Sequence, residues 1–84
     1  MGPDVFIFDE GYGFDIVTDF DLGVDLLDVE RAGARGIVDL NIESYGDDRG
    51  AVVTYTDMGD QIVLLGVDHR LLNSDNFIFV EFVL

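Results

Sequence analysis

Along the chain, hydrophobic residues alternate with polar ones or form short runs bounded by Gly and Asp. No window has the i, i+3, i+4, i+7 spacing of a long amphipathic helix, so the chain is predicted to be all-β. One short helical turn is expected at His69–Asn73, with Asp68 as its N-cap. The expected strands are Val5–Phe8, Asp15–Thr18, Asp25–Val29, Ile37–Ser44, Ala51–Thr56, Gln61–Leu65 and Phe77–Val83.

The second half of the chain is predicted to be antiparallel. A hairpin is expected to reverse at Asp57-Met58-Gly59-Asp60, between Ala51–Thr56 and Gln61–Leu65. A tight turn there requires Gly59 to adopt a positive φ.

A ten-residue repeat runs through the first 40 residues. Three glycines and three apolar residues recur at this spacing: Gly13, Gly23, Gly33, Val17, Leu27 and Ile37. Repeats that each contain one turn and one strand are typical of a parallel β-solenoid. We therefore expect one β-sandwich-like domain over residues 1–84. Short parallel β-roll coils in 1–40 would lead into an antiparallel cap in 41–84.

The segment from Glu10 to Thr18 carries candidate metal chemistry. Gly11 and Gly13 permit positive φ, which lets carbonyl oxygens converge, and Asp15 adds a carboxylate. This pattern predicts a calcium half-site. It matches the nonapeptide G-G-x-G-x-D-x-U-x, with Glu10 in place of the first glycine. An ordinary β-turn would use the same residues, and this alternative stays open.

Charge narrows the list of partners. The chain has 18 acidic and 4 basic residues among 84, a formal charge of −14, yet 49% of it is hydrophobic. This composition excludes a disordered acidic tail. Without lysine, and with four scattered arginines, the chain has no basic stripe for nucleic acid or anionic membranes. Calcium is the expected partner, and solubility is the alternative role of the charge.

The chain has no cysteine and no apolar run of the ~20 residues that a membrane span needs. The start, Met1-Gly2-Pro3-Asp4, has no feature of an N-terminal signal peptide. No membrane insertion is expected. The lack of cysteine fits either a cytosolic protein or an exported one that uses calcium in place of disulfides.

Two longer segments carry a family resemblance. DVFIFDEGYGFDIVTDFDLGVDLLDV resembles the end of an RTX array, where it enters the C-terminal domain of serralysin-type metalloproteases and related exoproteins. VVTYTDMGDQIVLLGVDHRLLNSDNFIFVEFVL resembles the hairpin, the L-x-G-V-D segment, the helical turn and the final F-x-F strand of those proteins. The resemblance covers Asp4 to Leu84.

The resemblance implies a set of calcium ligands. Phe14 departs from the family pattern, which usually has a small polar residue there, and the coils that would complete the site at Asp15 are not in this chain. The catalytic H-E-x-x-H motif is absent, and His69 is the only histidine. The expected metal-site residues are Gly11, Gly13, Asp15, Asp19, Asp21, Gly23, Asp25 and Asp28.

The last four residues, Glu81-Phe82-Val83-Leu84, place one acidic residue before three apolar ones. In the family this pattern is similar to an uncleaved secretion signal that a type I transporter reads. The resemblance thus implies an extracellular protein that is exported without an N-terminal signal peptide. A buried terminal strand over Phe77–Leu84 is the alternative, and the two are compatible.

Arg31 and Arg35 lie where the next calcium turn of the repeat would be. The turn that holds them is expected to lie at the same edge as the Gly11–Asp15 turn. Their guanidinium groups would pair with Asp15 or Asp9 and end the array. Solvated loop residues are the alternative.

Together with these patterns, the resemblance implies a non-enzymatic, calcium-binding C-terminal module of a type I-secreted RTX protein. It would cap the β-roll, nucleate its folding and carry the secretion signal, with upstream repeats or an enzyme domain as neighbours. No carboxylate pair is isolated enough to suggest catalysis, and no serine or cysteine accompanies His69. The alternative function is an extracellular carbohydrate- or surface-binding module, with Tyr12, Tyr45 and Tyr55 as candidate contacts.

Overall fold

The protein is built almost entirely from short strands and turns. A computed structural model describes residues 4–47 and 49–80. The strands are β1 (Val5–Ile7), β2 (Phe14–Val17), β3 (Leu26–Asp28), β4 (Asn41–Tyr45), β5 (Gly50–Thr54), β6 (Gln61–Leu65) and β7 (Phe77–Ile78). Single 3-10 turns form η1 (Ile37–Asp39), η2 (His69–Leu71) and η3 (Ser74–Asn76). The prediction of an all-β chain is confirmed.

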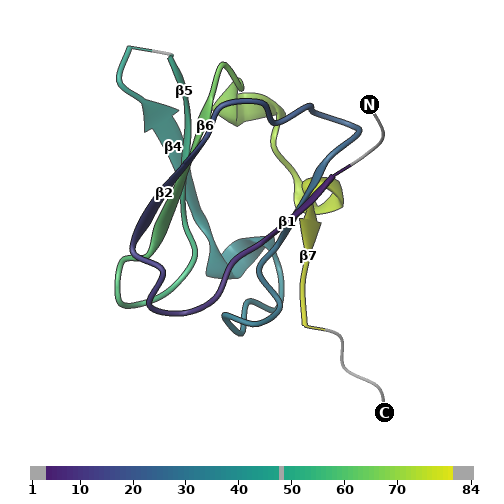
Figure 1. Ribbon diagram of the computed structural model, residues 1–84, viewed down its shortest axis with the longest axis vertical. Coiled ribbons are helices and arrows are strands. Elements are labelled where there is room, and N and C mark those ends of the chain that lie inside the picture. Colours follow the sequence, from purple (N-terminus) through teal and green to yellow (C-terminus); the bar gives the residue numbers. More distant parts are fainter. Residues whose placement is uncertain (1–3, 48, 81–84) are drawn as a thin grey trace.

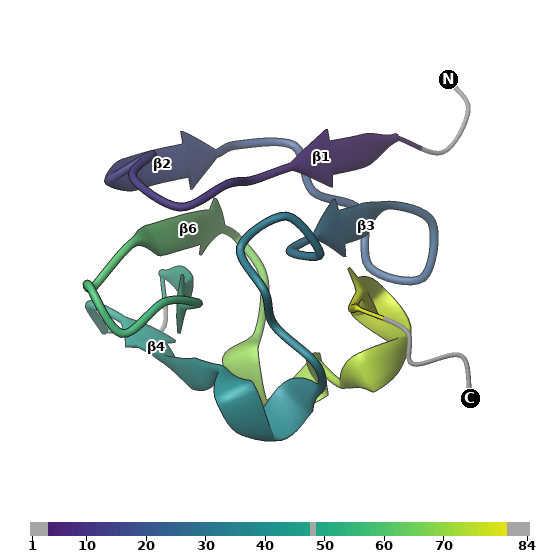
Figure 2. The same ribbon diagram turned by 90° about the horizontal axis from the view of Figure 1, so that it is seen from below.

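The strands form two sheets. One sheet has the order β1-β3-β7 with parallel neighbours throughout, and the other has the order β2-β6-β5-β4. In the second sheet β2 pairs with β6 in parallel, whereas β6, β5 and β4 are antiparallel. In Figure 1 the sheet with β2, β4, β5 and β6 lies on the left and the sheet with β1 and β7 on the right. Figure 2 shows them as neighbouring stacks, with β2 above β6 and β1 above β3.

The ten-residue repeat corresponds to a repeated backbone turn. Gly13, Gly23 and Gly33 have φ angles of +76°, +81° and +88°. Residues with a side chain rarely adopt this conformation, which explains why glycine recurs at each of these turns. About two repeats after β1 the chain returns to the same sheet as β3, where Leu26 lies opposite Val5.

The core lies between the sheets and is built from inward-facing residues of both. Leu27 and Val29 from the first sheet are fully buried, as are Ile62 and Leu64 from β6. The rings of Phe8 and Tyr55 meet with centroids 5.9 Å apart. Other members complete this cluster: Val17, Phe20, Ala34, Ala51, Val53, Val67, Leu72 and Phe77.

The hairpin prediction is confirmed. Strands β5 and β6 are antiparallel neighbours, with Val52 opposite Val63, and they reverse at residues 57–60. Gly59 has the required positive φ, +90°. The helical turn at η2 is also confirmed, because Asp68 caps it by accepting a hydrogen bond from the Arg70 N–H.

Two expectations for the second half differ from the structure. The strand expected at Ile37–Ser44 begins only at Asn41, because residues 37–39 form η1. The final strand was expected within an antiparallel cap, but β7 pairs with β3 in parallel. That strand was expected to run to Val83, but β7 ends at Ile78, and Phe79 and Val80 are not in a strand. Residues 81–83 lie outside the described residues.

Candidate functional site

The turn that contains Gly11 and Gly13 is closed by an aspartate from a distant hairpin. The backbone N–H groups of Gly11 and Gly13 donate to the two carboxylate oxygens of Asp60, at 3.0 and 2.9 Å. The Thr56 hydroxyl donates a further hydrogen bond of 2.8 Å to Asp60 Oδ2. Asp60 is only 5% exposed, so its charge is held by these donors and not by bulk water.

A second aspartate does the same at the other end of the molecule. Asp25 is 4% exposed, and its Oδ1 accepts a 2.9 Å hydrogen bond from the backbone N–H of Asp4. Its Oδ2 accepts another of 2.9 Å from the backbone N–H of Asp21, four residues earlier. Both carboxylate oxygens of Asp25 are therefore used within the protein.

The two aspartates occupy equivalent places in the two sheets. Asp25 directly precedes β3, and its partner Asp4 directly precedes β1, which pairs with β3 in parallel. In the same way Asp60 directly precedes β6, and Gly13 directly precedes β2. We call this arrangement a carboxylate clamp: an aspartate just before a strand binds the N–H just before the neighbouring parallel strand.

The clamps give the Gly11–Gly13 turn a polarity opposite to the one expected. A calcium half-site needs oxygen atoms that converge on a cation. Here two backbone N–H groups converge on an anion, the Asp60 carboxylate. The hydrogen bonds from Gly11, Thr56 and Gly13, in this order of importance, lower the pKa of Asp60 below its ordinary value.

Asp60 was missing from the residues expected on sequence grounds. Its contact with Gly13 joins residues 47 positions apart, which no local pattern reveals. A signal was nevertheless present. Asp60 follows Thr56 by four residues just before a strand, as Asp25 follows Asp21.

Asp15 is the predicted ligand with an unused oxygen. It lies on β2 between the exposed Phe14 and Ile16, so alternation points its side chain inward with Val17. Its Oδ2 is buried and has no hydrogen-bond partner among the described residues. A buried carboxylate oxygen without a partner is costly and is therefore a position at which a donor or a cation would be favourable.

The other predicted ligands are spread along the turns beside β3. Asp19 and Asp21 are exposed, and Gly23 lies in the turn between them and Asp25. Asp28 accepts a hydrogen bond of 3.0 Å from the Glu30 N–H. These residues therefore do not surround a common centre with Asp15.

This arrangement does not fit a complete calcium site. Within residues 4–47 and 49–80, no group of three or more His, Asp or Glu side chains could hold a metal ion together. Both oxygens of Asp25 accept hydrogen bonds from backbone N–H groups, and the buried Oδ2 of Asp15 has no hydrogen-bond partner among the described residues. The carboxylates of the described residues therefore do not by themselves supply the six to eight oxygen ligands that calcium takes.

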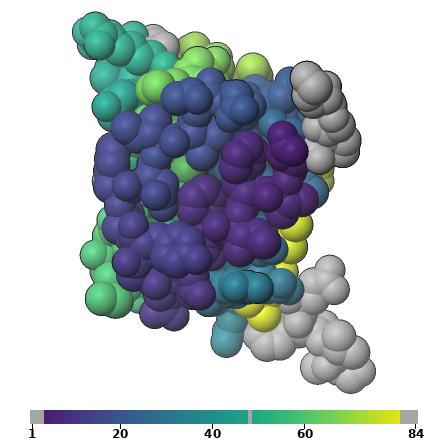
Figure 3. Space-filling model, viewed as in Figure 1, coloured from purple at the N-terminus to yellow at the C-terminus, as the bar shows by residue number. Residues whose placement is uncertain are grey.

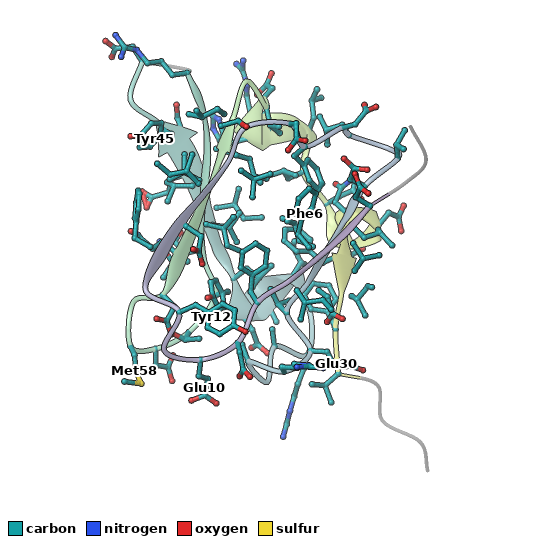
Figure 4. All side chains as sticks on the ribbon, in the orientation of Figure 1. Phe6, Glu10, Tyr12, Glu30, Tyr45 and Met58 are labelled. Atoms are coloured by element: carbon teal, nitrogen blue, oxygen red, sulfur yellow. The ribbon has the colours of Figure 1, made fainter. Side chains whose placement is uncertain are left out.

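Arg31 and Arg35, the expected arginine cap, lie on either side of Gly33 in the sequence. Glu10 and Gly33 line a common groove of about 600 Å³. Glu10 lies at the lower end of the molecule in Figure 4. The backbone N–H of Arg35 donates to Asp39 at 2.9 Å. The pairing of Arg31 or Arg35 with Asp9 or Asp15 stays a prediction.

The three tyrosines do not form one binding face. Tyr12 is exposed, and Tyr45 lies at the opposite end of the molecule (Figure 4). Tyr55 is buried, and its hydroxyl donates a 3.1 Å hydrogen bond to the Asp9 carbonyl oxygen. Burial, followed by the charges of Asp60 and Asp15, raises the pKa of Tyr55 to about 12. Tyr55 therefore belongs to the core.

The expected secretion signal, Glu81, Phe82, Val83 and Leu84, lies outside the described residues. Within residues 4–47 and 49–80, no helical segment is long and apolar enough to cross a membrane. No family model, curated protein or solved structure matches this chain.

Proposed function

We propose that this chain is a non-enzymatic structural module that ends a stack of parallel β-coils, a β-roll, in an exported protein. The observation that carries the proposal is the coil register. Strand β1 is followed by β2 in the other sheet, and the chain then returns beside β1 as β3. Each of these coils turns at a glycine with positive φ, and parallel solenoids repeat in this way.

The two ends of the stack support a capping role. The far edge of the second sheet is β4, whose Asn41 and Glu43 side chains are exposed and polar. The near edges, β1 and β2, expose apolar side chains instead, including Val5 and Phe14. Terminal repeats of solenoids need a polar outer face, and exposed edge strands need protection from pairing. A module with one polar end and one apolar end suits the end of a stack.

The resemblance to RTX exoproteins extends the proposal to export and to calcium. The tail Glu81–Leu84 would act as the signal for a type I transporter, and the protein would be extracellular. Calcium would act at the end formed by β1 and β2, where Asp15 has a buried oxygen, Oδ2, without a partner among the described residues. The remaining ligands would have to come from a neighbouring coil.

The proposal is tested by export and by metal titration. Fusion of a reporter to the complete chain should give export through a type I transporter, and deletion of Glu81–Leu84 should abolish it. A deletion variant that is exported at the same level contradicts the signal. For the chain with a neighbouring coil added before Asp4, which would supply the remaining ligands, calcium should raise the melting temperature more than matched magnesium, which demands a stricter geometry. Equal effects of the two ions contradict a specific site.

A further inference from the structure

The two sheets are open at the same side of the molecule. Strands β1 and β2 are the outer strands of their sheets and lie together, at the top in Figure 2. The Asp4 carbonyl accepts from Leu26 N–H at 2.9 Å, and the Phe8 N–H donates to Asp28 O at 2.9 Å. Since residues alternate along a strand, the N–H groups of Val5 and Ile7 face the open edge.

This open side is apolar. Residues of the N-terminal quarter, purple and dark blue in Figure 3, cover the face toward the viewer. Large apolar side chains there are between 47% and 54% exposed: Val5, Ile7, Tyr12, Phe14 and Ile16. A groove of about 350 Å³ between the strands is lined by the core residues Phe8 and Val17 and by Asp15. The interior of the two-sheet stack is thus partly open at this side.

Asp4 holds the same place before β1 that Asp25 holds before β3. The two residues are 21 positions apart, and Asp25 clamps the Asp4 N–H. The Asp4 side chain itself is exposed, and within the described part of the chain no donor contacts its carboxylate. A strand added in parallel to β1 would place its preceding N–H beside Asp4, in the geometry that Asp25 already provides one coil away.

We propose that the open side formed by β1 and β2 is the docking surface for one further parallel coil of the same chain type, with Asp4 as its carboxylate clamp. This inference rests on the proposed role as the end of a coil stack, and it names the partner and the residue that receives it. The coil would have about 21 residues, the offset between Asp4 and Asp25. Its first strand pairs with β1 and its second with β2.

The surface also sets the chemistry of the docking coil. Apolar side chains are required above Phe8 and Val17, because these residues line the groove. Above Asp15 the coil must supply a hydrogen-bond donor, since the buried Oδ2 has none. A second carboxylate at that position would require a cation between the two. A second copy of the chain is disfavoured as the occupant, because each copy carries a charge of −14.

A tandem protein tests the proposal. Residues 4–24 are repeated directly before Asp4, so that the sequence Asp-Leu-Gly-Val precedes Asp4 as it precedes Asp25. Asp15→Asn in the added copy places an amide donor above the native Asp15. We expect one cooperative unfolding transition with a raised midpoint. The amides of Val5 and Ile7 should exchange ~100-fold or more slowly than in the original chain, because they become paired.

Asparagine variants test the role of Asp4 as a clamp separately from the docking of the coil. In the tandem protein, Asp4→Asn should lower the midpoint and restore faster exchange at the amides of the added first strand. In the original chain the same substitution should leave the midpoint unchanged. Asp19→Asn, which removes the same charge from an exposed position, is the matched control. Equal effects of Asp4→Asn and Asp19→Asn in the tandem protein overturn the role of Asp4.

Further outcomes test the docking surface itself and the identity of its occupant. Unchanged exchange at Val5 and Ile7 in a folded tandem protein overturns the docking surface. If the tandem protein does not fold, a synthetic peptide of residues 4–24 with Asp15→Asn is added to the original chain. Chemical-shift changes confined to β1 and β2 then support docking, and their absence overturns it. A dimer of the original chain with protected β1 amides would identify a second copy as the occupant and also overturn it.

One more tandem protein distinguishes the calcium part of the proposed function from the docking surface. A tandem protein whose added copy keeps Asp15 stacks two carboxylates, and it should gain stability only with calcium. If the Asp15→Asn tandem docks but this version shows no calcium response, the docking surface stands and the calcium proposal fails. If neither version docks while the tail still directs export, the docking surface fails and the export proposal stands.

Discussion

Replacing Asp25 by asparagine tests whether a carboxylate, and not a bound ion, holds the turn before β3. Asp25 accepts 2.9 Å hydrogen bonds from the backbone N–H groups of Asp4 and Asp21, one on each oxygen. Asparagine has the same shape but one acceptor oxygen. Its amide nitrogen would face the second N–H group, so one buried donor would lose its partner.

The size of the effect follows from these two contacts. A hydrogen bond to a charged group contributes about 1.5–3 kcal/mol, and an unsatisfied buried donor costs about 1–3 kcal/mol. We expect Asp25→Asn to lower the free energy of unfolding by about 2–4 kcal/mol, because these terms overlap. For a domain of this size such a loss lowers the melting temperature by roughly 10–30 °C.

The assay is thermal and urea unfolding followed by circular dichroism, in EDTA and in calcium. Asp28→Asn is the matched control, because it removes the same charge but only an exposed contact with the Glu30 N–H. We expect the control to change stability by less than about 1 kcal/mol. If Asp25→Asn matches the control in EDTA, the clamp is refuted. If it differs from the control only in calcium, Asp25 is a metal ligand.

Three further predictions concern other positions. Gly50→Ala should destabilise the fold by about 1–3 kcal/mol in urea unfolding, because the new Cβ would lie 2.3 Å from the Leu64 carbonyl oxygen; Gly36→Ala, with open space around it, should not. The Asp60 pKa is lowered on folding, so its stabilisation is complete above about pH 3.8 and is lost as the pH falls further. The stability gap between wild type and Asp60→Asn should therefore narrow in acid, and a constant gap contradicts this. Tyr55 should ionise near pH 12, and wild-type absorbance at 295 nm minus that of Tyr55→Phe measures it.

Local patterns predicted the strands and the hairpin well, because these elements depend on neighbouring residues. A short apolar run between Asp60 and Gly66 predicted a strand at Gln61–Leu65, and β6 has the same bounds. The positive φ of Gly59 follows from the tight turn, and it is observed. At residues 37–39 the same reasoning was wrong. The place beside β2, where a continuing coil would add its strand, is taken by β6, so this segment has no such partner and forms a 3-10 turn.

The candidate site could be predicted only in part, because it depends on contacts between residues that are far apart in the sequence. The pairing of β7 with β3 joins Phe77 to Leu27, and no sequence period links these positions. The partner of the Gly11–Gly13 turn is Asp60. The hairpin that contains Asp60 was predicted, but its position beside this turn was not. The sequence contains the residue types of a calcium turn. Only the fold decides whether the turn directs carbonyl oxygens or N–H groups at its partner.

The carboxylate clamps also explain how parallel strands this short find their register. A slip of one residue would turn every side chain of a strand to the opposite face, moving Leu27 out of the core. Strands of three or four residues form too few backbone hydrogen bonds to prevent such slips by themselves. A clamp just before the strand prevents them, since Asp25 meets the Asp4 N–H only when Val5 lies opposite Leu26. Each buried carboxylate thus closes a turn and aligns a sheet in one contact, which gives these aspartates a structural reason to exist before any ion is considered.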